Sequence, residues 1–323
     1  AWTGGSVSGA TVLSGGIEFV WSGASAANTV VSSGGVLDAY GSTTGTVVHN
    51  GGLEFVFSGG VASGTTVHSG GNLDVFASGV ARGATINNGG WSYVWSGGLD
   101  SAGTIGSGGY EDILAGGNAM GMMVASGGTQ YVYGSAGGTV VNNGFQHVFA
   151  GGVASGTEVS NGGWGYVWAG GVVSNTTVKA GGLGLVFSGG TISGATLSGG
   201  FLEIQSGGTA GSSTIGFSSA GGTLQLDDSQ HFSGHIAGFG AAGAIDFADI
   251  AFGAQTTLGY TAAPGNTSGT LTLGDGTHIA AIQLFGQYLA ADFAKASDGH
   301  GGTLVTEAPM ADLQSLVIQP QHA

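Results

Sequence analysis

The chain has 323 residues, of which 72 are Gly, 3 are Pro and none is Cys, and only 7% are charged. This composition excludes collagen, because Pro is scarce and Gly has no three-residue period, and it excludes disorder, because 41% of the residues are hydrophobic. The net charge is -15, and the chain has only 3 Lys and Arg residues. Nucleic-acid binding needs clustered basic residues, so we expect no nucleic-acid partner. No apolar run is long enough to span a bilayer, so we also expect no membrane insertion.

Pairs of glycines divide the first two-thirds of the chain into units of mostly 19 residues. The pairs begin at Gly15, Gly34, Gly51, Gly70, Gly89, Gly108, Gly127, Gly162, Gly181 and Gly199, and Asn143 with Gly144 stands at the one gap. An aliphatic residue precedes each pair, from Val12 to Leu197, and a second one follows it, from Val20 to Ile204. The two aliphatic ladders therefore repeat with the glycines.

Each unit reads as strand, glycine turn, strand, glycine turn. The segments are short and rich in β-branched residues, which favours strands over helices. Glycine supplies the positive φ angles of tight turns, and a second pair such as Gly59 and Gly60 lies between the ladders. A period near 20 residues predicts an all-β chain that forms a β-solenoid (β-helix) of about eleven coils of ~19 residues, with the ladders stacked in its core.

The residue that follows the second ladder is aromatic in nine of ten units. Strand alternation places it on the face opposite the ladders, together with residues two and four positions earlier, and so many rings would overfill a narrow interior. We therefore predict an outward aromatic face. Its candidate ligand-binding residues are Trp21, Tyr40, Trp91, Tyr93, Trp95, Tyr133, Trp164, Tyr166 and Trp168, with the acidic candidates Asp38, Asp74 and Asp112 beside them. Such rings can hold sugars, or they can pack on each other or on another chain.

Three glutamates conflict with this assignment of faces. Glu18, Glu54 and Glu111 share the parity of the internal valines, so we expect either a bulge after the glycines or a reversal of the two faces. The carboxylates recur on alternate coils, which would keep stacked ones roughly 10 Å apart. This spacing suits stability better than it suits the paired carboxyl groups of a glycosidase.

The remaining motifs are weak. His49 and His68 occupy the same position on successive coils but lack a third fixed ligand. The GxGxxG match at Gly238 has no strand-to-helix context, and such matches are expected by chance at this glycine content. We therefore predict no catalytic residue, no metal site and no cofactor.

The repeat ends near residue 215. Segments 222–226, 244–247, 269–273 and 279–284 still read as strands, Asp275 and Gly276 signal a hairpin, and 288–296 is the one stretch that could form a short helix. A solenoid end exposes strand edges and an open core, so an irregular terminal module is expected as a cap. The predicted domains are a β-solenoid at 1–215, a β-rich capping module at 216–306 and a tail or linker at 307–323.

The unit Gly-Gly-x-x-x-Val-x-x-Gly-Gly-x-x-x-x-Thr-x-Val occurs at 51–67 and at 162–178. It resembles the AIDA-type repeat of autotransporter passenger domains over roughly residues 1–215. The resemblance implies a β-solenoid adhesin, extracellular or on the bacterial cell surface, that acts in adhesion, self-association or biofilm formation, with Ser/Thr glycosylation possible. The aromatic face adds glycan binding to these expected functions. Its partners would be glycans, a host or neighbouring cell surface, or a second copy.

Two other functions are compatible with the sequence. One is a carbohydrate-active β-helix enzyme, a polysaccharide lyase or a glycoside hydrolase, with a cleft lined by Trp, Tyr, Asp and Glu. The other is an inert spacer that displays another domain. Turnover of a polysaccharide would favour the enzyme, and binding without turnover would favour the adhesin.

Overall fold

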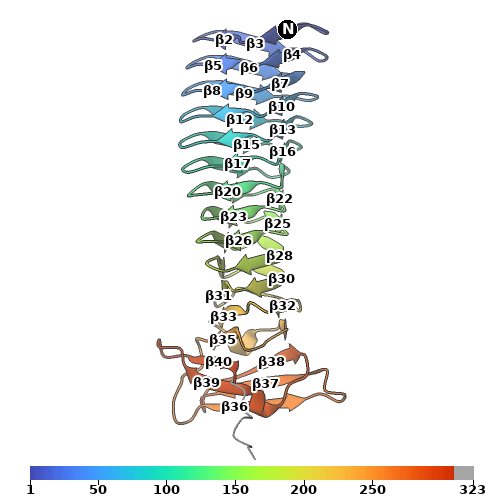
Figure 1. Ribbon diagram of the computed structural model, residues 1–323. Coiled ribbons are helices and arrows are strands. Elements are labelled where there is room, and N and C mark those ends of the chain that lie inside the picture. The colour runs from blue at the N-terminus through green and yellow to red at the C-terminus, as the bar shows by residue number, and fades with distance from the viewer. Residues whose placement is uncertain (309–323) are drawn as a thin grey trace, which may run out of the picture.

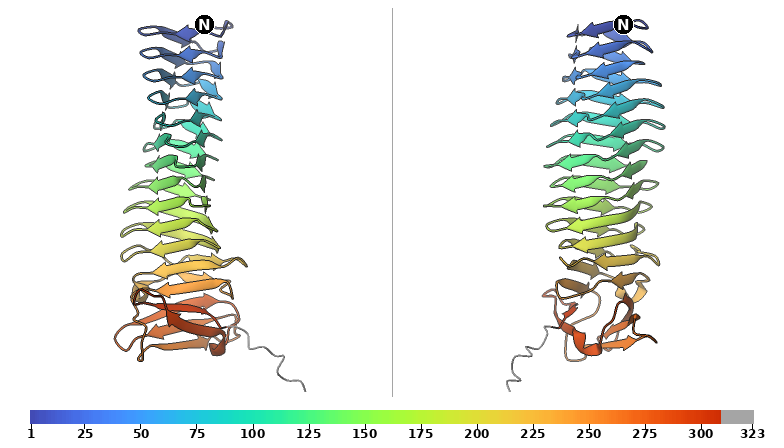
Figure 2. Two further views of the ribbon diagram at one scale, coloured as in Figure 1. Left: turned by 60° about the vertical axis from the view of Figure 1, so that its left-hand side comes forward. Right: turned by 45° about the vertical axis from the view of Figure 1, so that its right-hand side comes forward.

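The fold is a rod of stacked β-coils with a cap at one end (Figure 1). It is seen in a computed structural model that describes residues 1–308; residues 309–323 of the expected tail lie outside the described part. Figure 2 shows that the coils keep nearly the same cross-section along the rod, from the N-terminal end to the cap.

Two sheets run along the rod. Sheet 1 has 15 strands, namely β3 (Ile17–Val20), β6 (Val36–Ala39), β9 (Leu53–Val56), β12 (Asn72–Val75), β15 (Trp91–Val94), β18 (Tyr110–Ile113), β21 (Thr129–Val132), β24 (Phe145–Val148), β27 (Trp164–Val167), β29 (Leu183–Val186), β31 (Phe201–Ile204), β33 (Gly222–Leu226), β35 (Gly243–Phe247), β40 (Thr303–Glu307) and β39 (Phe293–Ser297). Sheet 2 has 25 strands, namely β1 (Ser6–Ser8), β2 (Thr11–Val12), β4 (Ser25–Ala27), β5 (Val30–Val31), β7 (Ser42–Thr44), β8 (Val47–Val48), β10 (Val61–Ser63), β11 (Thr66–Val67), β13 (Val80–Arg82), β14 (Thr85–Ile86), β16 (Leu99–Ser101), β17 (Thr104–Ile105), β19 (Asn118–Met120), β20 (Met123–Ala125), β22 (Ser135–Gly137), β23 (Val140–Asn142), β25 (Val153–Ser155), β26 (Glu158–Ser160), β28 (Val172–Lys179), β30 (Thr191–Ser198), β32 (Thr214–Phe217), β34 (His235–Ala237), β36 (Thr257–Ala262), β37 (Ser268–Gly274) and β38 (Ile279–Phe285).

Successive coils pair in parallel and in register. In sheet 1, Val56 of β9 pairs with Val75 of β12, and Val75 pairs with Val94 of β15. In sheet 2, Val48 of β8 pairs with Val67 of β11. Like residues of successive units therefore lie above one another, and the predicted β-solenoid is confirmed.

The two aliphatic ladders form the core. Every member from Val12 to Leu197 and from Val20 to Ile204 is at most 7% exposed. Sheet 1 contributes the ladder that starts at Val20, and sheet 2 contributes the ladder that starts at Val12. The interior is thus a narrow column of small aliphatic side chains between the two sheets.

Parallel pairing continues beyond the end of the repeat. β33 and β35 extend sheet 1, so that the solenoid has about 13 turns. The antiparallel strand β40 then pairs with β35, and β39 pairs with β40. On sheet 2, β38 pairs in parallel with β34 and carries the antiparallel strands β37 and β36. These antiparallel strands cover the edge that the last coil would otherwise expose.

The cap contains the segments for which we predicted a hairpin and a short helix. The hairpin signal is confirmed, because Asp275 accepts hydrogen bonds from the backbone N–H groups of Thr277 and His278 between β37 and β38. The helix considered at 288–296 is wrong: a single 3₁₀ turn, η2 (Ala290–Asp292), leads into β39. Pairing of β39 with β40 and burial of Phe293 outweigh the weak local preference for a helix. A second 3₁₀ turn, η1 (Ser229–His231), precedes β34.

Candidate functional site

The outward residues of sheet 1 form columns of rings along the rod. The column just past the strands, here called the outer column, contains Trp21, Tyr40, Phe57, Phe76, Trp95, Leu114, Tyr133, Phe149, Trp168 and Phe187. Trp21 is 40% exposed, Trp95 is 41% exposed and Tyr133 is 38% exposed, whereas the preceding residues of the Val20 ladder are buried. The aromatic side chains thus point outward, as the strand alternation predicted.

Rings on neighbouring coils of the outer column stack face to face. Their centroids are 5.3 Å apart for Trp21 and Tyr40, and 4.2 Å apart for Trp168 and Phe187. The planes of these pairs differ by 15° and 12°. Stacking along the rod covers the ring faces, so the ring edges are what the column presents to solvent.

The other candidate rings lie beside the outer column. Trp91 and Tyr93 stack at 5.6 Å, and Trp164 and Tyr166 stack at 5.7 Å. All nine aromatic candidates therefore lie on one surface. We give the name aromatic strip to the rings of the outer column together with six rings beside it, namely Trp91, Tyr93, Tyr110, Tyr131, Trp164 and Tyr166.

Acidic side chains are interleaved with these rings. The register of sheet 1 places Asp38, Asp74 and Asp112 in one outward column, on alternate coils, and burial raises the pKa of each carboxyl. Asp74 is 7% exposed, and its Oδ1 accepts a hydrogen bond of 2.8 Å from Nε1 of Trp95 on the next coil. The acidic candidates are therefore partly covered by the rings.

A histidine takes the same place as Asp74 further along the rod. Nε1 of Trp168 donates to Nδ1 of His147 at 3.2 Å, again from one coil to the preceding one. Burial lowers the pKa of His147 to about 4, so the imidazole is neutral near pH 7 and its Nδ1 can accept this bond. Trp95 and Trp168 thus each use the indole N–H group to satisfy an acceptor on the preceding coil.

Glu54 lies inside the solenoid, so the bulge and the reversal of faces that we expected from its parity are both wrong. The chain neither bulges nor reverses its faces; the parity of Glu54 was right and its side chain is fully buried. Three hydroxyl groups solvate its carboxylate: Thr43 and Thr46 donate to Oε1 at 2.7 and 3.1 Å, and Thr65 donates to Oε2 at 2.8 Å. Glu18 also faces inward and accepts a bond from Thr29.

A second carboxyl group accompanies Glu111 in the core. Asp100 of β16 is fully buried, like Glu111, and the two carboxyl groups are within hydrogen-bonding reach of each other. Burial raises the pKa of Asp100 to about 6 and raises that of Glu111 well above its usual range, with the charge of Asp100 adding to the second shift. The expectation that the carboxylates keep apart is wrong here, because Asp100 faces Glu111 from the opposite sheet.

Hydrogen bonds extend from this pair through the next coils. Gln130 donates to Glu111 at 2.8 Å, Gln146 donates to Gln130 at 2.8 Å, and Thr157 donates to Gln146 at 3.1 Å. Neither the pair nor this chain of side chains reaches the surface, because all of these residues are at most 2% exposed. The interior carboxyl groups therefore have no access to a polysaccharide.

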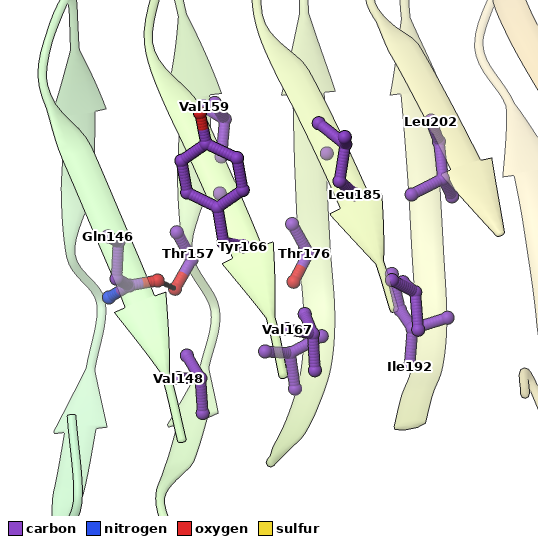
Figure 3. Close-up of a pocket in the computed structure, with 14 residues that line it drawn as sticks. Gln146, Val148, Thr157, Val159, Tyr166, Val167, Thr176, Leu185, Ile192 and Leu202 are labelled. Atoms are coloured by element: carbon purple, nitrogen blue, oxygen red, sulfur yellow. Dashed lines mark hydrogen bonds between the residues drawn. The ribbon is translucent and has the colours of Figure 1, made fainter. Parts of the chain in front are cut away.

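The polar chain ends at a small internal cavity (Figure 3). Gly165 and Gly184 occupy the positions that Gln130 and Gln146 fill on earlier coils, and the space left is about 20 Å³. The hydroxyl group of Thr176 is buried there without a partner. This volume has room for about one water molecule and no larger ligand.

Two further features of the chain concern metal binding and membrane insertion. The rings of His49 and His68 stack at 5.2 Å on successive coils. Within residues 1–308, no group of three or more His, Cys, Asp or Glu side chains is placed to hold a metal ion. The described part of the chain also has no helix that is long and apolar enough to cross a bilayer.

Known proteins share this repeat. A family model described as "Adhesin of bacterial autotransporter system, probable stalk" (AIDA) matches residues 49–109. The crystal structure of a TibC-catalysed, hyper-glycosylated TibA fragment is 30% identical to the chain, and the match covers 97% of that fragment and 69% of this chain with a TM-score of 0.48. This chain belongs to the AIDA family of autotransporter adhesins. None of the curated proteins compared with it matches.

The matched AIDA segment contains much of the candidate site. It runs from β9 to β17 and includes three of the aromatic candidates, Trp91, Tyr93 and Trp95. It also includes Asp74, which the indole of Trp95 contacts, and the buried Glu54. In this AIDA chain the polar core and the aromatic strip are thus two sides of the same coils.

Sequence reasoning placed the aromatic candidates on one face but missed the polar core. The signal for Glu54 and Glu111 was present, since their parity pointed inward. Their hydroxyl and carboxyl partners lie in strands of sheet 2 or in the turns between those strands, eight to eleven residues away in the chain. No local pattern in a strand reveals a partner that stands on the opposite sheet.

Proposed function

We propose that this chain is the rod of an adhesin, displayed at the bacterial cell surface, that binds glycans through the aromatic strip. The single observation that carries the proposal is the line of partly exposed rings on one face of sheet 1. Membership of a family of autotransporter adhesins supports display outside the cell. Glycan binding, in contrast, is inferred only from the chemistry of the aromatic strip.

The chemistry of the strip favours sugars over charged partners. Tyr and Trp combine an apolar ring with a polar group, and sugars offer apolar C–H faces with hydroxyl groups around them. The acidic residues Asp38 and Asp112 lie between the rings, and the whole sequence has only 3 basic residues. An anionic polysaccharide would be repelled by this rod, so neutral or amino-bearing glycans fit better.

Self-association is a second candidate, and a different surface favours it. On sheet 2, Met120 is 48% exposed, Met123 is 43% exposed and Val153 is 43% exposed, and Val172 pairs with Val153 on the next coil. Apolar side chains gathered in this way on a weakly charged face are typical of protein contacts. Two copies of the rod could bury this patch while their aromatic strips stay free.

A binding experiment separates these functions. The purified chain is applied to an array of neutral, amino-bearing and acidic glycans, and its molar mass in solution is measured by light scattering. We expect Trp91→Ala with Trp164→Ala to abolish glycan binding and to leave the mass unchanged. Met123→Ser is the control on sheet 2, and it should leave glycan binding intact.

The result that would overturn the proposal is equally definite. Wild-type chain that binds no glycan on the array, or strip variants that bind as wild type does, would contradict it. Release of reducing or unsaturated sugar that Asp74→Asn or Asp112→Asn abolishes would support the enzyme instead. A chain that neither binds, associates nor turns over sugar would be a spacer.

A further inference from the structure

The stack of rings in the outer column is interrupted at one coil. Phe76 stacks on Trp95 at 5.8 Å, and Tyr133 stacks on Phe149 at 4.8 Å, but Leu114 stands between Trp95 and Tyr133. The two rings that border this gap are also among the most exposed of the column, at 41% and 38%. Leu114 is half-buried and its side chain is smaller than an aromatic ring, so Trp95 and Tyr133 have no stacked aromatic neighbour on the side that faces this coil.

The register fixes the width of the gap. The backbone N–H of Leu114 donates to Val94 on the coil of Trp95, and the N–H of Tyr133 donates to Ile113 on the coil of Leu114. Trp95 and Tyr133 are thus two coils apart, roughly 10 Å at the spacing of hydrogen-bonded strands. Stacked rings have centroids about 4.5–7 Å apart, so the spacing between Trp95 and Tyr133 suits one further ring of pyranose size, placed over the smaller side chain of Leu114.

A carboxylate oxygen beneath the gap lacks its expected partner. Asp74 and His147 each accept an indole N–H from the outer-column residue 21 positions later. The corresponding residue for Asp112 is Tyr133, whose ring has no N–H group, and Oδ1 of Asp112 is buried without a hydrogen bond. Among the four acceptors of this column, Asp38, Asp74, Asp112 and His147, the buried atom without a partner in the described structure belongs to Asp112.

A groove adjoins Tyr133 on its other side. The turn after β21 is short, because Gly134 directly follows Tyr133 where most coils have a two-glycine turn. The space of about 530 Å³ left there is lined by Ala115, Tyr133, Gly134 and Ala150 among others. A chain of sugars that places one unit over Leu114 has room to continue across the rod.

We infer that the gap between Trp95 and Tyr133 is a subsite for one pyranose unit of a neutral or amino-bearing glycan, with Leu114 as its floor and Asp112 as acceptor of a hydroxyl or amino proton. This inference rests on the proposed glycan binding and gives it a location. The basic residues of the chain lie elsewhere: Arg82 and Lys179 on sheet 2, and Lys295 in the cap. An acidic sugar would find no counter-charge at the gap.

The decisive variant closes the gap without removing any ring. Leu114→Phe continues the stack, so we expect the chain to melt at an unchanged or higher temperature. We expect its affinity for the linear hexamers of glucosamine and N-acetylglucosamine, measured by calorimetry and by quenching of Trp fluorescence, to fall about tenfold or more. Leu114→Ala keeps both faces open and should retain binding.

The role of Asp112 has its own matched control. Asp112→Asn should weaken binding of the glucosamine hexamer more than that of the N-acetylglucosamine hexamer, because only the former carries a positive charge. Asp38→Asn removes the same charge from the same column, four coils away, and should bind both hexamers as wild type does. Equal behaviour of the two variants would contradict the assignment of Asp112.

Failure of this inference differs from failure of the proposed function. If Leu114→Phe binds both hexamers as wild type does while Trp164→Ala loses them, the strip binds glycans but the gap is not the subsite. If wild type binds neither hexamer and no glycan on the array, both proposals fail. Binding of a lysine-rich peptide, lost in Leu114→Phe without any sugar binding, would assign the gap to a cationic side chain instead.

Discussion

Nε1 of Trp95 donates a hydrogen bond of 2.8 Å to Oδ1 of Asp74 on the preceding coil. Asp74 is only 7% exposed, so the indole satisfies an oxygen that has largely lost contact with water. Burial raises the pKa of Asp74, and the hydrogen bond from Trp95 opposes that rise. The ring thus contributes to the surface of the strip and to the stability of the coil beneath it.

Trp95→Phe should therefore destabilise the rod more than a loss of ring area explains. We expect a cost of about 1–3 kcal/mol in the free energy of unfolding, because the oxygen of Asp74 is left unsatisfied. The measurement is urea unfolding followed by circular dichroism. Trp91→Phe is the control, since Trp91 stacks on Tyr110 at 4.5 Å and has no side-chain hydrogen bond in the described structure. Equal costs for the two variants would contradict the role of the hydrogen bond.

Thr65 and Thr46 should differ in their value to the core. Thr65→Val removes the hydroxyl group that satisfies Oε2 of Glu54, so we expect it to cost about 1–3 kcal/mol of unfolding free energy. Thr46→Val should cost less, because Thr43 still donates to Oε1. Chemical unfolding of both variants measures the difference.

Replacement of the whole cluster provides the converse test. Leu37 and Leu73 occupy the position of Glu54 on the neighbouring coils, so a leucine fits there. Glu54→Leu combined with Val at Thr43, Thr46 and Thr65 removes donors and acceptor together, which is often neutral or stabilising. A combined variant that is much less stable than Thr65→Val alone would show that the carboxylate has another role.

Contacts between residues one repeat apart could be predicted from the sequence, whereas contacts between the two sheets could not. Val56 and Val75 could be placed in one core column because their spacing equals the repeat and their parity repeats on every coil. The outward face of Trp95 follows from the same alternation. The fate of Glu54 could not be derived, because Thr43 and Thr65 approach it from another sheet. Nor could spacing alone show that Leu114 leaves a gap, since that requires knowing that the neighbouring rings stack on each other.

The buried pair should stabilise the rod less as the pH rises, because Asp100 and Glu111 are protonated more easily in the folded chain than in the unfolded one. Burial moves the pKa of Asp100 from 3.8 to about 6, and that of Glu111 moves in the same direction. At this pair the folded state then binds more protons than the unfolded state, so the contribution of the pair to the unfolding free energy falls from about pH 4 to above pH 6.

Variants isolate this contribution. We expect Glu111→Gln and Asp100→Asn each to flatten the fall in unfolding free energy between about pH 4 and about pH 8. Glu158→Gln is the control, because Glu158 forms a surface ion pair with Lys179 and is not part of the buried pair. Stability curves of wild type and Glu111→Gln that stay parallel over this range would rule out the pair as the source.

The two glycines of each turn should respond differently to substitution. Gly59 has a φ of 83°, and an added Cβ would find no atom closer than the carbonyl oxygen of Tyr40 at 3.9 Å. Ser78 holds the same place one coil later with a φ of 61°, so Gly59→Ser should cost about 1 kcal/mol or less.

Gly60 is constrained by its neighbour rather than by its own φ angle. A Cβ there would lie 2.1 Å from the carbonyl oxygen of Ala39 on the preceding coil, which the pairing of the strands holds in place. Gly60→Ala must therefore push two coils apart, and we expect it to cost about 3 kcal/mol or more and to lower the melting temperature well below that of Gly59→Ser. If Gly60→Ala melted with Gly59→Ser, close approach of the coils could not be the reason that the second glycine of each pair recurs.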